Sequence, residues 1–153
     1  MSETKSEFKL AGLRLPYKTT NRNHQSDTDC GTLWQKFEQD KIAELISEKL
    51  SDEIYAVYFD FEKDETAPFA YFIGCRLAPD SVIPANLDTL VIPAQRYEKF
   101  TAKGQMTGCV TEVWKSIWNS SINREFGFDF EVYDERSRDW SKAEVDVYVS
   151  VAE

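Results

Sequence analysis

The sequence is poor in the residues that build metal centres and disulfide frameworks. It has one histidine and three cysteines in 153 residues. Cys30, Cys75 and Cys109 are odd in number and widely spaced, which argues against a disulfide framework. His24 stands alone in a polar stretch, and no CxxC or HxxxH motif occurs, so we expect no metal and no other cofactor. A lone histidine in a predicted loop also argues against a Ser-His-Asp triad and against metal-dependent activity.

Basic residues and long apolar runs are scarce as well. The net charge is −9, and no window gathers enough Lys or Arg to form a basic stripe. Nucleic-acid affinity depends on such residues, because they displace counterions from phosphates, so we expect no direct nucleic-acid binding. No apolar run approaches the roughly 20 residues that span a bilayer. The polar start of the chain has no secretory h-region, and we therefore expect a cytoplasmic protein that does not bind membranes.

Aromatic residues, by contrast, are abundant, with 10 Phe, 7 Tyr and 4 Trp. Such rings can build a core, and they can also build the walls of a flat binding site. The chain length favours one domain. We predict a disordered tail at residues 1–7 and a single domain at residues 8–153.

The spacing of apolar residues predicts an alternation of strands and helices. Prolines, asparagines and aspartates mark the breaks between them, including a polar loop at 21–29. A capping-box pattern, with Gln35 three residues after Thr32, indicates the start of the first helix. In chain order we predict a strand at 8–20, a helix from Thr32 to about Leu50, strands at 54–62 and 69–77, a strand at 89–101 interrupted by Pro93, a loop at 104–108, a helix around 110–118, and strands at 126–133 and 143–151.

The order strand, helix, strand, strand occurs twice, which indicates an internal repeat. The tetrapeptide at 59–62, Phe-Asp-Phe-Glu, recurs at 128–131 in the strand after the second helix. We predict repeat one at 8–77, a linker at 78–88 and repeat two at 89–151. Two such units give an α+β fold, in which an antiparallel sheet carries two helices on one face and a ligand groove lies between the helices.

Several segments also resemble a known family in their order and spacing. They are Val91-Ile92-Pro93-Ala94 leading to Tyr97, Phe100 and Gly104, then Trp114 and Trp118, Phe130-Glu131-Val132-Tyr133, and Asp146-Val147-Tyr148-Val149. Together they resemble the GyrI-like domain, also called the AraC-type effector-binding domain. The sequence departs from the family pattern in having Gln95 where a glycine is usual and Ser150 where a proline is usual.

The resemblance implies a domain that binds a small molecule. In related regulators this domain is fused to a helix-turn-helix DNA-binding region. The resemblance here begins near residue 8, so we expect a stand-alone member without a DNA-binding region. Drug or toxin sequestration, transcription regulation and contact with gyrase are roles that the resemblance implies for such bacterial proteins.

Glu131 is the central candidate residue. Strand alternation puts it on one face with Gly127, Asp129 and Tyr133. Alternation alone favours a solvent-exposed strand residue, whereas the resemblance implies a pocket glutamate. A buried carboxylate without a partner is costly, and a cationic ligand would relieve that cost. Glu62, in the same place of the first tetrapeptide, is expected to be a surface charge.

The other candidate residues are aromatic. Flat cations bind well over aromatic faces, although each of these side chains could equally be part of the core. Tyr71 and Phe72 point to opposite faces of one strand, so only one of them can face the groove. The full set of predicted ligand-binding residues is Glu131, Trp114, Trp118, Tyr71, Trp34, Tyr148 and Tyr97.

Three functions remain open at this stage. The first is a protein that binds amphipathic or aromatic cationic compounds, with a sequestration or sensing role. The second, implied by the resemblance, is a hydrolase of strained electrophilic compounds that uses Glu131 as base or nucleophile and a tyrosine as proton donor. The third is an acidic interaction protein that binds gyrase or another protein partner. Binding is favoured over catalysis, and no catalytic residue is assigned.

Overall fold

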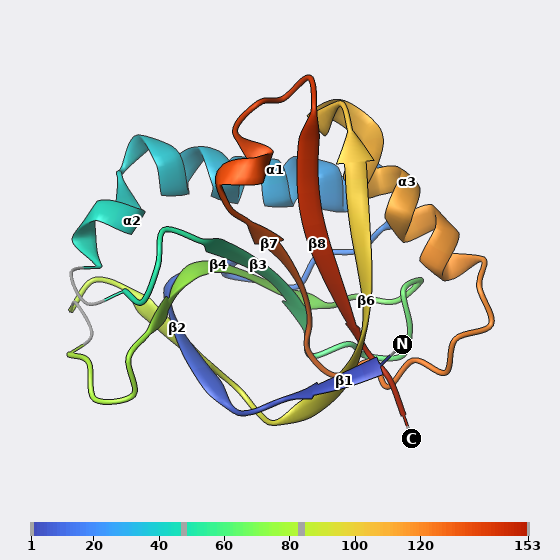
Figure 1. The fold of residues 1–153 in the computed structure, drawn as a ribbon, viewed down its shortest axis with the longest axis horizontal. Coiled ribbons are helices and arrows are strands. Elements are labelled where there is room, and N and C mark those ends of the chain that lie inside the picture. Colours follow the sequence, from blue (N-terminus) through green and yellow to red (C-terminus); the bar gives the residue numbers. More distant parts are fainter. Residues whose placement is uncertain (1, 47–48, 83–84, 153) are drawn as a thin grey trace.

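The architecture is a single curled antiparallel sheet of eight strands, seen here in a computed structural model that describes residues 2–46, 49–82 and 85–152. In Figure 1 the helices α1, α2 and α3 lie along one side of the sheet, and the strands curl away from them. The elements are β1 (Ser2–Lys5), β2 (Phe8–Arg14), the 3-10 helix η1 (Arg22–His24), α1 (Gln25–Gln39), α2 (Ile42–Leu45), β3 (Ile54–Phe59), β4 (Ala70–Leu77), β5 (Asp88–Ile92), β6 (Gln95–Gly104), α3 (Met106–Trp118), β7 (Asp129–Tyr133), the 3-10 helix η2 (Glu135–Ser137) and β8 (Ala143–Ser150).

Strand alternation divides the core between the two faces of the sheet. On the face away from the helices, side chains from β2 to β8 form one largely aromatic cluster that fills the inside of the curl. On the other face, one cluster packs under α1 and α2 and another under α3. Because successive residues of a strand point to opposite faces, each central strand contributes to both sides. Every strand of the spatial order β1-β6-β8-β7-β3-β4-β2-β5 pairs antiparallel with its neighbours.

A strand near the N-terminus corrects the prediction of a disordered tail at 1–7 for residues 2–5; Met1 lies outside the described residues. Ser2–Lys5 forms β1, whose residues pair antiparallel with β6 from Ser2 opposite Glu98 to Lys5 opposite Gln95. The segment is polar and short, so it carries no alternation signal. Its order comes from backbone pairing with the open edge of β6, because an edge strand offers a row of free N–H and C=O groups to any extended segment.

The first helix begins earlier than the capping pattern predicts. Helix α1 starts at Gln25, so the polar loop predicted at 21–29 is wrong for its second half. Thr32 lies in mid-helix, where its hydroxyl donates to the carbonyl of Thr28 at 2.9 Å. The first turns are mostly exposed and therefore lack apolar periodicity. The helix ends before Lys41, whose positive φ of 50° separates α1 from α2. The predicted continuation to Leu50 is wrong, because Ile46 is extended and Lys49 forms a β-bridge with Leu77; residues 47–48 lie outside the described residues.

Proline and glycine mark the other boundaries. Pro93 separates β5 from β6, as the predicted interruption requires. The predicted loop at 104–108 is corrected in part, since α3 begins at Met106, although Gly108 with a φ of 119° keeps its first turn irregular. Strand β7 is shorter than the predicted 126–133, because Phe126 has a φ of 56° that an extended strand does not allow.

The two predicted repeats share a strand order. The first reads β3-β4-β2 outward from the centre of the sheet and the second reads β7-β8-β6, with β3 and β7 adjacent. Two units related by a two-fold axis between β3 and β7 would have this order, and their superposition stays a prediction. The shared tetrapeptides do not occupy equivalent places, however. Phe59 ends β3 and is followed by Asp60 at a φ of 52°, whereas Asp129 to Glu131 lie inside β7.

Candidate functional site

A pocket of about 440 Å³ lies on the helix side of the sheet, between α1 and α3. The strands β3, β4 and β7 form its floor, and the loops after β3 and α3 close one end. Its lining is aromatic with a few charged groups, and consists of Asn21, Ser26, Asp27, Cys30, Trp34, Tyr58, Phe61, Glu65, Phe69, Tyr71, Met106, Val110, Thr111, Trp114, Trp118, Arg124, Glu131 and Tyr133.

Glu131 lies at the floor of this pocket and is only 2% exposed. Three donors hold its carboxylate. The Tyr58 hydroxyl and the Trp114 indole nitrogen donate to Oε2 at 2.8 and 2.7 Å, and the Tyr133 hydroxyl donates to Oε1 at 2.6 Å. The β3–β7 register places Ala56 opposite Glu131, so Tyr58, two residues along, shares its face. Within the part of the chain that the structure describes, no Lys, Arg or His forms an ion pair with this carboxylate.

Burial dominates the electrostatics of this group. It raises the pKa of Glu131, and the three hydrogen bonds from Tyr133, Trp114 and Tyr58 offset only part of that rise. Burial, reinforced by the charge of Glu131, also raises the pKa values of Tyr58 and Tyr133 well above their usual range. Both phenols therefore keep their protons at neutral pH. The site is a carboxylate with fixed donors and no counter-ion, which a positive charge in the pocket would stabilise.

Aromatic rings continue the pocket walls on either side of Glu131. The Trp34 indole nitrogen donates to the Tyr71 hydroxyl at 2.8 Å, and the Trp34 ring lies 5.1 Å from that of Tyr133. Tyr58 lies between the rings of Tyr71 and Trp114, at centroid distances of 5.0 and 5.2 Å. These hydrogen bonds and edge contacts fix the ring orientations, so the walls form before any ligand enters.

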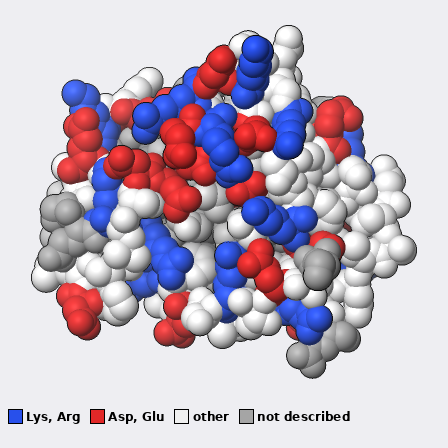
Figure 2. Space-filling model, in the orientation of Figure 1, with Lys and Arg blue, Asp and Glu red and all other residues white. Residues whose placement is uncertain are grey.

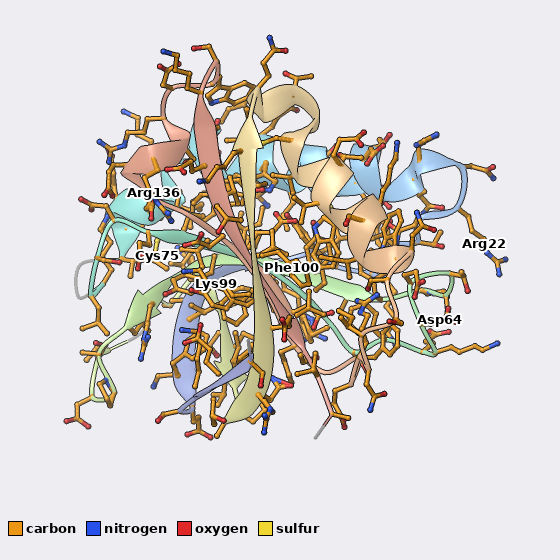
Figure 3. The ribbon with its side chains drawn as sticks, turned by 45° about the vertical axis from the view of Figure 1, so that its right-hand side comes forward. Arg22, Asp64, Cys75, Lys99, Phe100 and Arg136 are labelled. Atoms are coloured by element: carbon orange, nitrogen blue, oxygen red, sulfur yellow. The ribbon has the colours of Figure 1, made fainter. Side chains whose placement is uncertain are left out.

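Arg124 closes one end of the pocket. Its guanidinium pairs with Asp129 at 2.9 Å and with Glu65 at 3.5 Å, and it lies over the Phe126 ring at 4.2 Å. Nearby, the Arg22 side chain donates to the carbonyl of Thr66 at 3.2 Å. Figure 3 shows Arg22 and Asp64 at this end of the molecule, where η1 and the β3–β4 loop approach each other. Side-chain bonds between loops, together with the isolated backbone bridges of Thr19 with Phe69 and of Arg124 with Val151, thus shape this end.

Five of the predicted ligand-binding residues come together in the pocket, namely Glu131, Trp114, Trp118, Tyr71 and Trp34. Trp118 is 37% exposed and lies at the rim. Tyr71, rather than Phe72, faces the pocket. Glu62 is an exposed residue that pairs with Lys18 at 3.4 Å, as expected for a surface charge.

The prediction that Tyr97 and Tyr148 share a pocket with Glu131 is wrong, because neither residue lines this pocket. Both lie in the aromatic cluster on the opposite face of the sheet. Conversely, sequence reasoning missed Tyr58 and Cys30 as lining residues. Tyr133 shares strand parity with Glu131 and could have been found from alternation, whereas Tyr58 becomes a candidate only once the β3–β7 pairing is known.

Two further observations concern metal binding and membrane crossing. Among residues 2–46, 49–82 and 85–152, no three His, Cys, Asp or Glu side chains are grouped to hold a metal ion. Across the same residues, every helix is too short or too polar to cross a membrane.

A curled antiparallel sheet with helices on one face is the fold of GyrI-like effector-binding domains, and the resemblance read from the sequence is confirmed at this level. The model of the family described as integron-associated effector binding protein matches residues 3–151. The chain belongs to this family.

Individual proteins are similar to this chain in sequence or in fold. A protein of Bacillus subtilis (strain 168), YobU, which is named as a transcriptional regulator, is 28% identical over 123 residues, or 78% of this chain and 77% of its own. The structure of SAV2435 bound to tetraphenylphosphonium has a TM-score of 0.79 at 18% identity, with 99% of this chain and 93% of that one covered. An integron cassette protein of Vibrio cholerae has a TM-score of 0.74 at 22% identity, with coverage of 99% and 95%.

Proposed function

We propose that this chain is a small-molecule binding protein that captures amphipathic or aromatic cations, with Glu131 as their counter-charge. The observation that carries the proposal is a carboxylate 2% exposed, at the floor of an aromatic pocket, without a cationic partner among the described residues. A buried charge of this kind is normally paired or neutralised. A ligand cation would supply the missing partner.

The pocket walls favour a ligand with a large flat apolar body. Ring faces and edges from Trp34, Tyr58, Tyr71 and Trp114 surround the space, and cation–π attraction adds about 1–2 kcal/mol where water is excluded. The volume of about 440 Å³ falls in the range typical of drug-sized ligands. Area and ring contact therefore supply most of the affinity, and the carboxylate selects the sign of the charge.

The hydrogen bonds to Glu131 narrow the class of cation further. Oε2 already accepts from Tyr58 and Trp114, and Oε1 accepts from Tyr133. A primary ammonium would lose hydrogen bonds to water and find few free acceptor positions in exchange. Cations without N–H donors, such as phosphonium or quaternary ammonium ions, lose no such bonds. We expect them to bind better than primary amines of equal size.

The names of two similar proteins are consistent with the proposal. SAV2435 was solved with tetraphenylphosphonium, an aromatic cation without hydrogen-bond donors. The regulator name of YobU is compatible with a sensing role for this chain, and capture of the ligand alone would amount to sequestration.

A matched pair of ligands tests the proposal. Methyltriphenylphosphonium and triphenylphosphine oxide have nearly the same shape and differ in charge. Titration of the protein with each, followed by tryptophan fluorescence, should give micromolar binding of the cation and binding of the oxide at least tenfold weaker. Equal affinity for the two compounds would remove the reason for assigning a cation pocket.

The hydrolase alternative rests on the two tyrosine hydroxyls that contact Glu131. Both carboxylate oxygens accept short hydrogen bonds, at 2.6 to 2.8 Å, which lower their strength as nucleophiles. The geometry therefore favours binding over turnover. Incubation with candidate electrophiles and mass spectrometry of protein and ligand would detect a covalent adduct or a hydrolysed product, and either result would favour the hydrolase.

A further inference from the structure

A second hollow, of about 220 Å³, opens on the sheet face away from the helices. It is formed by β1, β2, β3, β4, β7 and β8, and the cation pocket lies on the other side of the sheet. In Figure 1 the sheet face away from the helices is the inner side of the curl, near which β1 lies. Its lining consists of Lys5, Phe8, Glu53, Tyr55, Arg76, Phe130, Val132, Asp146 and Tyr148.

The floor of this hollow is a cluster of rings. Phe130 stacks on Tyr148 at a centroid distance of 5.0 Å and meets Phe8 and Tyr55 at 5.6 Å each. Tyr148 is only 8% exposed, yet its hydroxyl has no hydrogen-bond partner among the residues described. Burial raises the pKa of Tyr148 to about 12, so the hydroxyl remains a donor at neutral pH. A largely buried residue thus presents an unused polar group at the edge of an aromatic floor.

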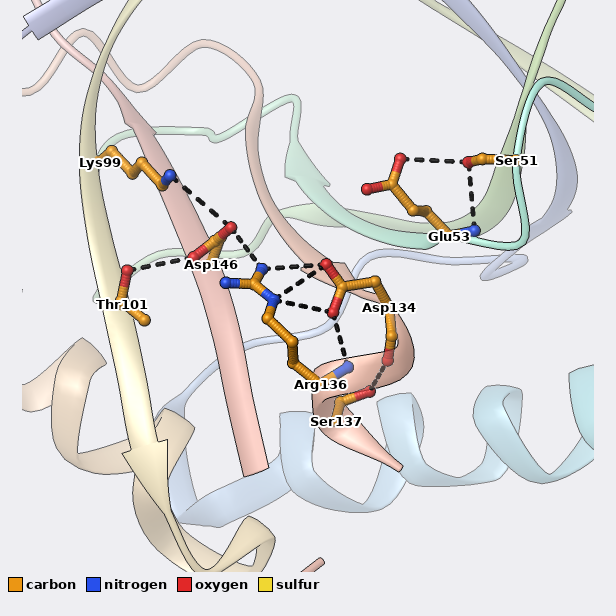
Figure 4. A network of polar contacts seen from close by, with 8 residues as sticks. All are labelled: Ser51, Glu53, Lys99, Thr101, Asp134, Arg136, Ser137 and Asp146. Atoms are coloured by element: carbon orange, nitrogen blue, oxygen red, sulfur yellow. Dashed lines mark hydrogen bonds and ion pairs between the residues drawn. The ribbon is translucent and has the colours of Figure 1, made fainter. Parts of the chain in front are cut away.

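The charged residues around the floor differ in how well they are paired. Asp146 contacts Arg136 at 2.6 Å and Lys99 at 3.8 Å, and it accepts from Thr101 at 3.1 Å, as Figure 4 shows. The Asp146 carboxylate therefore already has both ionic and hydrogen-bond partners. Figure 2 shows acidic and basic side chains intermixed over the face that is viewed in Figure 1.

Arg76 and Glu53 are the charged groups left without an ionic partner. Among the described residues, no carboxylate lies within ion-pair distance of Arg76, whose guanidinium lies over the Phe8 ring at 4.8 Å. Glu53 has no basic partner there either, and it accepts only from the Ser51 hydroxyl at 3.1 Å. In Figure 4 Glu53 stands apart from the Asp134–Arg136–Asp146 network. Lys5, the other basic residue of the lining, pairs with Glu3 at 3.9 Å and lies over the Tyr148 ring at 4.5 Å. Arg76 and Glu53 are therefore the positive and the negative group with capacity to bind a ligand.

We propose that this hollow binds a small zwitterion with a flat apolar body, the chemistry of an aromatic amino acid. The ligand carboxylate meets Arg76, whose planar fork suits a carboxylate, with the Tyr148 hydroxyl as a further donor. The ammonium group meets Glu53, and the ring lies on the aromatic floor. The hollow is smaller than sites for drug-sized ligands, which fits a single-ring molecule. This site is distinct from the proposed cation pocket.

The test is calorimetric titration of the whole protein with three probes of one shape. L-Phenylalanine carries both charges, 3-phenylpropanoate only the carboxylate, and 2-phenylethylamine only the ammonium. The titrations are made with the cation pocket filled by methyltriphenylphosphonium, so that a probe bound beside Glu131 would be displaced. We expect saturable binding of L-phenylalanine, with each single-charge analogue at least tenfold weaker.

Variants locate the site. Arg76→Gln should weaken L-phenylalanine binding tenfold or more, and Tyr148→Phe, which removes only the unused hydroxyl, should weaken it severalfold without affecting folding. Arg138→Gln removes an exposed charge outside the hollow and is the matched control, for which we expect no change. If Arg76→Gln does not fold, Glu53→Gln replaces it.

The proposal is wrong if L-phenylalanine shows no saturable binding at millimolar concentration. It is also wrong if methyltriphenylphosphonium abolishes the binding, or if the hollow variants bind like the wild type. Each of these results leaves the cation pocket untouched, because that pocket is measured with its own pair of ligands.

Discussion

Replacing Glu131 with glutamine is the sharpest test of the cation pocket. The change keeps the shape of the side chain and removes its charge. We take a separation of about 6 Å between the Glu131 carboxylate and the ligand charge and an effective dielectric constant of about 20. Coulomb's law then gives an attraction of about 3 kcal/mol. Reorganisation of the three donors around a neutral amide reduces the net effect, so we expect the cation to bind about 2 kcal/mol more weakly, or roughly thirtyfold.

The neutral ligand provides the control within the same experiment. Triphenylphosphine oxide has no charge for Glu131 to attract, so Glu131→Gln should change its affinity by less than threefold or strengthen it slightly. The glutamine carbonyl still accepts from Trp114 and Tyr58, which should preserve the pocket walls. Tryptophan fluorescence reports both titrations, because Trp34 and Trp114 line the pocket.

Two outcomes would refute this reasoning. If the glutamine variant binds both ligands more weakly by the same factor, the substitution has disturbed the pocket shape rather than removed a counter-charge. If neither affinity changes, the cation lies far from Glu131, and another group must balance its charge. Thermal unfolding of the variant distinguishes a folded protein from a damaged one in either case.

Three further predictions concern protonation, reactivity and packing. Because burial raises the pKa of Glu131, the folded protein holds a proton that the unfolded chain has lost, and the free energy of unfolding should fall as pH rises from the ordinary pKa of 4.5 through the raised pKa. Urea unfolding of Glu131→Gln should lack this pH dependence, and parallel pH curves for the wild type and the variant would contradict the prediction. Burial also raises the pKa of the Cys30 thiol, so we expect its alkylation to be slow. Methyltriphenylphosphonium should slow the alkylation of Cys30 further and leave the alkylation of Cys109 unchanged, as measured by peptide mass spectrometry; equal protection of both thiols would argue against ligand contact at Cys30. A Cβ on Gly74 would overlap the Ala11 carbonyl oxygen of the neighbouring strand, so Gly74→Ala should destabilise the fold by about 1–3 kcal/mol in chemical denaturation. Gly31 faces open space on α1, so Gly31→Ala should stabilise the fold slightly. Equal effects of the two substitutions would show that the close approach of β2 and β4 at Gly74 does not require glycine.

The central strands and the burial of Glu131 follow from local patterns together with the family resemblance. Alternation correctly separates Glu131 from Phe130, and the family resemblance, rather than alternation, implies that the Glu131 face carries the pocket. Helical spacing places Trp34 and Trp114 on the helices that line the pocket. These signals are local, because each depends on residues a few positions apart in the chain.

Features that depend on tertiary pairing could not be predicted in this way. Nothing in the residues of Ser2–Lys5 reveals that the edge of β6 is open to them. Tyr58 reaches Glu131 only because β3 lies beside β7. The prediction that Tyr148 lines the same pocket as Glu131 failed for the same reason, since alternation separates two faces without telling which of them the helices cover.

The alternation within β7 has a consequence for how the gene can vary. Phe130 and Glu131 are adjacent in sequence, but one ring belongs to the aromatic cluster inside the curl and one carboxylate to the pocket under the helices. Loss or gain of a single codon within Asp129–Tyr133 would exchange these faces, since a slip of one residue reverses every side chain of a strand. Length changes at 119–121, between the end of α3 and the segment whose Arg124 bridges Val151, shift no strand register. Insertions and deletions are therefore expected to accumulate in that loop and to be absent from β7.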